Sequence, residues 1–249
     1  AVSPEQIVIG AGAEYLYLLL AQLLGRDTVF AVEDPGYPKI RQVYGALGAA
    51  CVPVPLDSQG VDPDILTASG AGALHISPNH QYPTGLVTPI TRRQTLLRWA
   101  EDAEGTIIED DYDSEFRLTG KPIPSLQSMD ITQKVIYINT FTKSLSSTMR
   151  ISYMVLPPEL ANRFLEQLSF YSCTVSNFEQ YALMRFINEG YFEKHINRMR
   201  NFYHKQRDIL LDAIKRSPLS SHVTIMEEDS GLHFLLKLKM ELSDKEFMQ

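Results

Sequence analysis

Strands and helices alternate along most of this sequence, and that alternation limits the folds that the chain can adopt. Six short apolar runs rich in β-branched residues have the length of buried strands: QIVIG, TVFAVED, GALHISP, TIIEDD, KVIYINT and ISYMVLP. Helical patterns occupy residues 13–25, 37–48 and 90–105, and each ends at a glycine suited to a helix C-terminus. The alternation predicts an α/β fold with three layers, in which helices cover both faces of a mostly parallel sheet.

The pattern changes near Pro158, after which helices predominate. A long helix with a polar face is expected from roughly Tyr191 to Arg216, followed by strands near 222–226 and 231–239. We therefore expect a large domain over residues 1–190, then a connecting helix and the start of a small α+β domain over residues 191–249. Both ends of the sequence look cut, so we expect a fragment of a longer protein.

Composition excludes several classes of function. No apolar run approaches the roughly 18 to 20 residues that cross a bilayer, and the first residues lack an export signal, so a cytoplasmic location is expected. A net charge of −7 argues against nucleic-acid binding by this segment. The two cysteines and six histidines show no metal-ligand spacing, so no metal site built from these residues is expected. The basic stretch 194–207 is interpreted as a solvated helix, because Ile196, Met199 and Tyr203 form an apolar stripe opposite its charges.

Polar and aromatic residues follow several predicted strands, at the edge where α/β sheets bind ligands. IVIGAGAEYLYLLL combines a strand, a glycine turn and a helix start, which either directs N–H groups at an anion or is simply a tight turn. Tyr37 lies in a Pro-Gly-Tyr-Pro turn and could be a stacking surface or ordinary packing. TIIEDDYDSEF could form part of a pocket, a magnesium site or a solvated loop. Its four crowded carboxylates are Glu109, Asp110, Asp111 and Asp113.

Lys143 stands among several hydroxyl side chains in NTFTKSLSSTMR, directly after the apolar run VIYI and seven residues before Arg150. A lysine amine can form a Schiff base with an aldehyde, and a carboxylate can keep a pyridine nitrogen protonated. An aromatic ring can cover a pyridine, while a helix N-terminus, hydroxyls and an arginine can hold a phosphate. Together these are the requirements of pyridoxal 5′-phosphate.

Several stretches resemble one known family: SPNHQYPTG, RRQTLLRWA, IIEDDYDSEFR, YINTFTKSLSSTMRISYMVLP and GLHF. They resemble the aminotransferase-like domain of the MocR/GabR family of GntR-type bacterial transcriptional regulators, within the fold-type I aminotransferases. The similarity covers essentially the whole chain. It implies a domain that binds pyridoxal phosphate and senses an amino acid or amine, that forms homodimers, and that reaches DNA only through an N-terminal winged-helix domain absent from this chain.

Two other functions remain open from the sequence. The chain could be a fragment of a class I/II aminotransferase that transfers amino groups between amino acids and 2-oxo acids. It could also be a degenerate fold used only for dimerisation. Whether this chain has full transaminase activity is left open.

The resemblance implies a role for each matching residue. Lys143 would be the Schiff-base lysine, Asp110 the partner of the pyridine nitrogen, and Tyr112 a donor to the phenolic oxygen of the cofactor. The ring of Tyr37 would lie over the pyridine. The phosphate would be held by the backbone at Ala13 and Glu14 and by the side chains of Thr140, Thr142 and Arg150.

Several departures from the family pattern bear on this site. Family members usually have Thr-Gln where this chain has Ala13 and Glu14, so a hydroxyl is lost and a carboxylate is added near the phosphate. Lys39 stands where some GABA-sensing members have an arginine for the ligand carboxylate, and lysine is the weaker bidentate partner. The sequence does not decide which of Asn79, His80 and Gln81 faces the cofactor.

Overall fold

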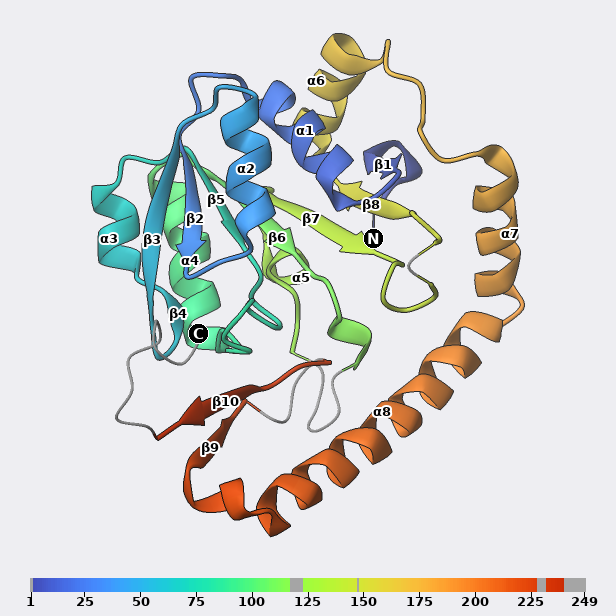
Figure 1. Cartoon of the computed structure of the whole chain (residues 1–249). Helices are drawn as coiled ribbons and strands as arrows, with labels where there is room; N and C mark the ends of the chain where they lie inside the picture. Colours follow the sequence, from blue (N-terminus) through green and yellow to red (C-terminus); the bar gives the residue numbers. More distant parts are fainter. Residues whose placement is uncertain (1, 117–122, 147, 228–231, 240–249) are drawn as a thin grey trace.

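The computed structural model describes residues 2–116, 123–146, 148–227 and 232–239. Ten strands are defined within them: β1 (Ile7–Gly10), β2 (Phe30–Asp34), β3 (Cys51–Asp57), β4 (Gly60–Val61), β5 (Ala73–Ile76), β6 (Thr106–Asp110), β7 (Val135–Thr140), β8 (Ser152–Val155), β9 (Val223–Met226) and β10 (Leu235–Leu238). Eight of them form one sheet, in the order β1-β8-β7-β6-β5-β2-β3-β4 (Figure 1). The neighbours from β7 to β3 are parallel, whereas β1, β8 and β4 pair antiparallel. The predicted mostly parallel sheet is therefore confirmed.

Helices cover both faces of this sheet, as the alternation of elements predicted. One face carries α1 (Ala13–Leu24), α2 (Pro38–Ala46) and α6 (Pro158–Leu168), which share a core cluster with Phe30 and Ile138. The other face carries α3 (Pro63–Ala68), α4 (Ile90–Asp102) and α5 (Leu126–Met129), which pack on Leu74 and Ile107. Each fully buried aliphatic side chain contributes about 1.5–3 kcal/mol, so the two clusters hold the three layers together.

The three predicted helices form, but one of them does not end as predicted. At the end of α1, Gly25 adopts a φ of +96°, as expected for a glycine C-cap. After α4 the left-handed residue is Glu104, with φ +50°, and not Gly105. Position 105 favours glycine for a different reason: a Cβ there would lie 2.9 Å from the indole of Trp99.

The sequence analysis missed β3, β4 and α3. β3 contains Pro53 and Pro55, and prolines weaken a strand pattern because they donate no hydrogen bond to a neighbour. Both prolines are exposed, and β3 pairs with β4 only at Leu56 and Asp57, so most of β3 behaves as an edge strand. An edge strand tolerates prolines that a central strand would not.

The C-terminal part also follows the predicted pattern. A short helix, α7 (Asn177–Asn188), begins with a capping box in which Ser176 and Glu179 bond reciprocally. α8 (Tyr191–Arg216) then runs along one side of the molecule to the two-stranded sheet of β9 and β10 (Figure 1). Ile196 is buried on α8, and the ring of Tyr203 packs against Phe116 at 5.5 Å, consistent with the predicted apolar stripe.

Part of the predicted C-terminal domain, residues 240–249, lies outside the described residues. Among the residues that are described, every helix is too short or too polar to traverse a bilayer.

Candidate functional site

The glycine turn between β1 and α1 supports the guanidinium of Arg150. Gly12 is the N-cap of α1 and has a φ of +100°, a conformation that favours glycine. A Cβ at this position would lie 2.4 Å from Nη2 of Arg150, so the guanidinium rests directly against the backbone of the turn. Arg150 lies two residues before the start of β8, and β8 pairs with β1. This pairing brings the arginine to the first turn of α1.

Glu14, in that first turn, binds two cations. Its Oε1 lies 2.9 Å from Nζ of Lys39, and its Oε2 lies 3.0 Å from Nη2 of Arg150. Burial works to raise the pKa of Glu14, but hydrogen bonds from Lys39 and from its own backbone N–H, with the charges of Lys39 and Arg150, outweigh it and lower the pKa. Glu14 is therefore a carboxylate at neutral pH, and Lys39 is paired with it.

Hydroxyl groups gather at the end of β7. The hydroxyls of Thr140 and Thr142 lie 2.9 Å apart, and Ser152 donates to the hydroxyl of Thr140 at 2.8 Å. The structure thus brings together the two threonines that the sequence analysis paired. Lys143 follows them with an exposed side chain, and it makes no hydrogen bond or ion pair within the described part of the chain.

A buried polar network surrounds Asp110 at the end of β6. Tyr17 donates a hydrogen bond to its carboxylate, and Nε2 of His75 lies 3.5 Å from the same oxygen. The hydroxyl of Tyr44 lies 2.8 Å from Nδ1 of His75. Burial, followed by the charge of Asp110, raises the pKa of Tyr17 well above its ordinary value, so Tyr17 acts as a proton donor in this network.

The sequence analysis did not identify Tyr17, Tyr44 or His75. Both tyrosines lie on buried faces of amphipathic helices, where an aromatic residue is normally packing. His75 offered a usable signal, because a histidine in the middle of an otherwise apolar strand requires a hydrogen-bond partner.

Two of the crowded carboxylates serve the fold. Glu109 is buried and accepts the N–H groups of Leu126 and Gln127, 2.8 and 2.9 Å away, at the start of α5. Asp111 accepts hydrogen bonds from Asn79, Ser114 and Tyr137. Among the described residues, no group of three or more metal-ligating side chains is arranged to hold a metal ion.

Several buried polar atoms near Lys143 have no hydrogen-bond partner among the described residues. They are the Tyr112 hydroxyl, both ring nitrogens of His80, Oδ1 of Asp113 and Nε2 of His233. The ring of His80 lies 4.1 Å from that of His233 and 5.7 Å from that of Tyr112, measured between centroids. An unpaired buried polar atom costs about 1–3 kcal/mol, so such a concentration is typical of a ligand site.

Electrostatics distinguish two members of this group. Burial raises the pKa of Asp113 to about 6, and the charge of Lys143 opposes that rise. Burial also lowers the pKa of His80 to about 3, with a smaller contribution from His233. The imidazole of His80 is therefore neutral at physiological pH and can both donate and accept a hydrogen bond.

The structure separates the three residues that the sequence left open. Asn79 accepts from Arg93 at 2.7 Å and donates to Asp111, so both ends of its amide are used. Gln81 donates to the carbonyl of Pro35 and accepts from Thr84. Only His80, of these three, keeps unpaired polar atoms beside Tyr112.

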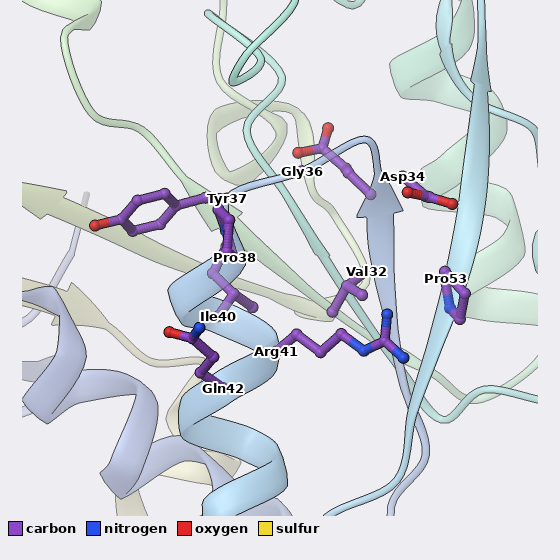
Figure 2. A pocket seen from close by; sticks show the side chains of 10 residues that line it. Val32, Asp34, Gly36, Tyr37, Pro38, Ile40, Arg41, Gln42 and Pro53 are labelled. Atoms are coloured by element: carbon purple, nitrogen blue, oxygen red, sulfur yellow. The ribbon is translucent and has the colours of Figure 1, made fainter. Parts of the chain in front are cut away.

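Tyr37, the N-cap of α2, lies beside a cavity of about 390 Å³ between the end of β2, α2 and β3. Figure 2 shows its ring projecting on the side opposite to Arg41 and Pro53, which line the cavity. The ring is 36% exposed and meets Tyr82 edge-on at 5.6 Å. Part of the ring surface is therefore accessible to a ligand.

Comparison with known proteins places this geometry in a family. The model of the family described as aminotransferase class I and II matches residues 1–249. The chain belongs to the aminotransferase class I and II family. Within it, the chain is 43% identical to the HTH-type transcriptional regulator YdeL of Bacillus subtilis (strain 168), over 99% of this chain and 53% of the regulator. It is 33% identical to the probable rhizopine catabolism regulatory protein MocR of Rhizobium meliloti, over 98% of this chain and 49% of that protein.

These regulators confirm the resemblance to MocR-type proteins, and the chain spans about half the length of the curated relatives that it matches. Solved aminotransferases share the fold. The kynurenine aminotransferase of Pyrococcus horikoshii, solved in complex with PMP, superposes with a TM-score of 0.84 at 27% identity, over 98% of this chain and 63% of that one. An archaeal alanine:glyoxylate aminotransferase superposes with a TM-score of 0.85 at 26% identity, over 99% of this chain and 63% of that one.

Proposed function

We propose that this chain is the pyridoxal-phosphate-binding, ligand-sensing domain of a GntR/MocR-type transcriptional regulator, with the cofactor held covalently on Lys143. The observation that carries the proposal is the convergence of Lys143, Asp110 and the Gly12 turn at one edge of the sheet, in a chain whose curated relatives are HTH-type regulators. When bound, pyridoxal phosphate supplies an electrophilic aldehyde and an acceptor for electrons.

The residues present fit this cofactor. The buried hydroxyl of Tyr112 has no protein partner within the described residues, so it is free to donate to a phenolic oxygen. Because Gly12 has no side chain, a group bound to Arg150 can approach the backbone at the start of α1. Two features of the cofactor, its ring oxygen and its phosphate, thus find suitable groups.

Each residue has a distinct proposed role. The amine of Lys143 would bond to the aldehyde, and the carboxylate of Asp110 would pair with the protonated pyridine nitrogen. Tyr37 would cover one face of the ring. The phosphate would be held by Thr140, Thr142, Arg150 and the N–H groups of Ala13 and Glu14. The two threonines lie at and just after the end of β7, and Arg150 lies against the Gly12 turn.

Tyr17 and His75 are proposed as positioning residues for Asp110. Their contacts restrain the position of the carboxylate that is proposed to pair with the pyridine nitrogen. Lys39, which the resemblance places at the ligand carboxylate, would have to leave Glu14 to reach it.

The assembly of the whole protein extends this proposal. We propose that the sensed ligand is an amino acid or amine, that the protein is a cytoplasmic homodimer, and that DNA is bound through a separate winged-helix domain. Residues 1–190 would form the cofactor domain, and residues 191–249 a connecting helix and the start of a small domain. Both cysteines, Cys51 and Cys173, are free, which suits a reducing compartment.

An aminotransferase is the second candidate function. It is favoured by the likeness to solved aminotransferases and by the presence of Lys143 and Asp110, since a lysine amine can also move the proton that transamination requires. Incubating the protein with amino acids and 2-oxo acids and measuring amino-group transfer separates this candidate from a sensor that binds ligand without turnover.

The first test is an absorbance titration of the purified protein with pyridoxal phosphate. A band at roughly 410–430 nm is expected as Lys143 bonds to the aldehyde, and borohydride should make that bond permanent. Lys143→Ala should show no such band, and mass spectrometry of the reduced protein should place the adduct on Lys143. If the protein forms no adduct at any cofactor concentration, or forms it equally without Lys143, the proposal is wrong.

A further inference from the structure

Glu14 places a carboxylate against the turn that is proposed to hold the phosphate. Its Oε2 lies 3.2 Å from the position that a Cβ on Gly12 would take, and Nη2 of Arg150 lies 2.4 Å from the same position. The carboxylate and the guanidinium therefore meet directly over the backbone of Gly12. The other carboxylate oxygen binds Lys39, which comes from the first turn of α2.

A carboxylate and a phosphate make the same kinds of contact. Both bind arginine through charge-assisted hydrogen bonds, and both are stabilised at the N-terminus of a helix. The carboxylate of Glu14 pairs with the guanidinium of Arg150 and the ammonium of Lys39, and it accepts a hydrogen bond from its own backbone N–H at the start of α1. These are the donors that a phosphate at this turn requires.

We infer that the carboxylate of Glu14 competes with the cofactor phosphate for Arg150, an inference that rests on the proposed function. The carboxylate neutralises Arg150, and it has to leave the guanidinium before a phosphate can bind there. A phosphate dianion bound beside an unmoved Glu14 would face a like charge, which is unfavourable at this distance. The residue thus weakens the binding of phosphate-bearing ligands while leaving the sites for the pyridine ring and the aldehyde unaffected.

The size of the effect follows from the exposure of the ion pairs. The side chains of Lys39 and Arg150 are 53% and 51% exposed, so solvent screens both ion pairs and limits the effect to about one order of magnitude in affinity. Removing the charge of Glu14 should therefore strengthen binding of pyridoxal phosphate about tenfold, which corresponds to about 1.4 kcal/mol.

The test compares Glu14→Gln with the original protein for two aldehydes, pyridoxal phosphate and pyridoxal, which lacks the phosphate. Dissociation constants come from absorbance titrations. Glu189→Gln is the matched control, because Glu189 also pairs with an arginine, Arg185, at 2.7 Å but lies on the exposed surface after α7. Circular dichroism and thermal melting establish that each variant is folded.

We expect Glu14→Gln to bind pyridoxal phosphate about tenfold more tightly, with pyridoxal unchanged and Glu189→Gln like the original protein. Equal or weaker binding of pyridoxal phosphate by Glu14→Gln overturns the inference. So does an equal gain for pyridoxal, because that gain would not arise at the phosphate.

A second measurement uses inorganic phosphate and needs no Schiff base. Phosphate should raise the melting temperature of Glu14→Gln more than that of the original protein, and Glu14→Gln combined with Arg150→Gln should lose this response. If neither aldehyde reacts with Lys143 but the phosphate response appears, the proposed function fails, and Glu14 competes with phosphate at this turn but not with a cofactor. If the aldehydes react and no phosphate response appears in any variant, the competitor role fails alone.

Discussion

The hydroxyl of Tyr17 on α1 donates a hydrogen bond to the carboxylate of Asp110 at the end of β6, although 93 residues separate them in sequence. Tyr17 is 2% exposed and Asp110 is 6% exposed, so water cannot readily replace either partner. The bond ties the helix that follows the glycine turn to the strand that carries the proposed partner of the pyridine nitrogen. The turn that is proposed to hold the phosphate and the carboxylate that is proposed to pair with the pyridine nitrogen are thereby held together.

Tyr17→Phe should lower the free energy of unfolding by about 1–3 kcal/mol, because it leaves a buried carboxylate without its hydroxyl donor. Urea denaturation followed by circular dichroism measures the change. Tyr181→Phe is the control, since Tyr181 is 63% exposed and should change the free energy of unfolding by less than about 0.5 kcal/mol. Equal stabilities for the two variants would show that the bond to Asp110 contributes nothing.

Arg93→Met should be the most destabilising of the substitutions considered. The guanidinium is fully buried on α4, donates to the carbonyls of Thr88 and Pro78 at 2.9 Å each, and lies 3.7 Å from Glu109. Removing it leaves a buried carboxylate and several acceptors without donors, at a cost of about 3–5 kcal/mol.

Arg98→Met on the same helix is the matched control for Arg93→Met, because Arg98 is exposed. Its free energy of unfolding should stay within about 0.5 kcal/mol of the original value. Similar losses from both substitutions in a urea titration would contradict the structural role assigned to Arg93.

The sequence was sufficient for six of the eight strands of the main sheet, because strand and helix patterns are local properties. It was insufficient where one element departs from its usual composition. β3 was missed since Pro53 and Pro55 contradict a central strand, and only the sheet order shows that β3 lies near an edge. In the same way, Glu104 could not be chosen over Gly105 as the left-handed residue without the position of Trp99.

For the candidate site, motifs indicated single residues but not their partners. The substitution at Glu14 showed that a negative charge had been added near the turn. Its pairing with Lys39 and Arg150 depends on how α1, α2 and the segment before β8 meet in space. Tyr17 was missed for the same reason, because it is recognisable only by what it contacts.

Gly12→Ala tests the cradle beneath Arg150, and Gly25→Ala is an unusually close control. The two glycines have φ values of +100° and +96°, but a Cβ on Gly25 would meet nothing within 4 Å. Both substitutions should lose about 1–3 kcal/mol from the strained backbone. Gly12→Ala should lose more and should also weaken binding of inorganic phosphate, since the guanidinium has to move. Identical losses in thermal melts, with phosphate binding unchanged, would rule out the close contact.

Asp113 should make stability depend on pH in a defined window. Burial raises its pKa from 3.8 to about 6, so between these values the folded protein keeps a proton that the unfolded chain has lost. The free energy of unfolding should therefore fall as pH rises from about 4 to about 6, by about 3 kcal/mol for this group, and level off above. Asp113→Asn removes the titrating group. Because asparagine also tolerates the φ of +62° at this position, the backbone should be unaffected.

The pH dependence is measured by urea denaturation at several pH values for the original protein and for Asp113→Asn. The difference between the two curves should have its slope between about pH 4 and pH 6, and the variant should be the more stable protein at pH 7. Lys143→Ala should extend the slope to higher pH, because the charge of Lys143 holds the pKa of Asp113 down. Parallel curves for the original protein and Asp113→Asn would mean that Asp113 titrates as an ordinary exposed carboxylate, and its place in the buried group beside His80 would have to be revised.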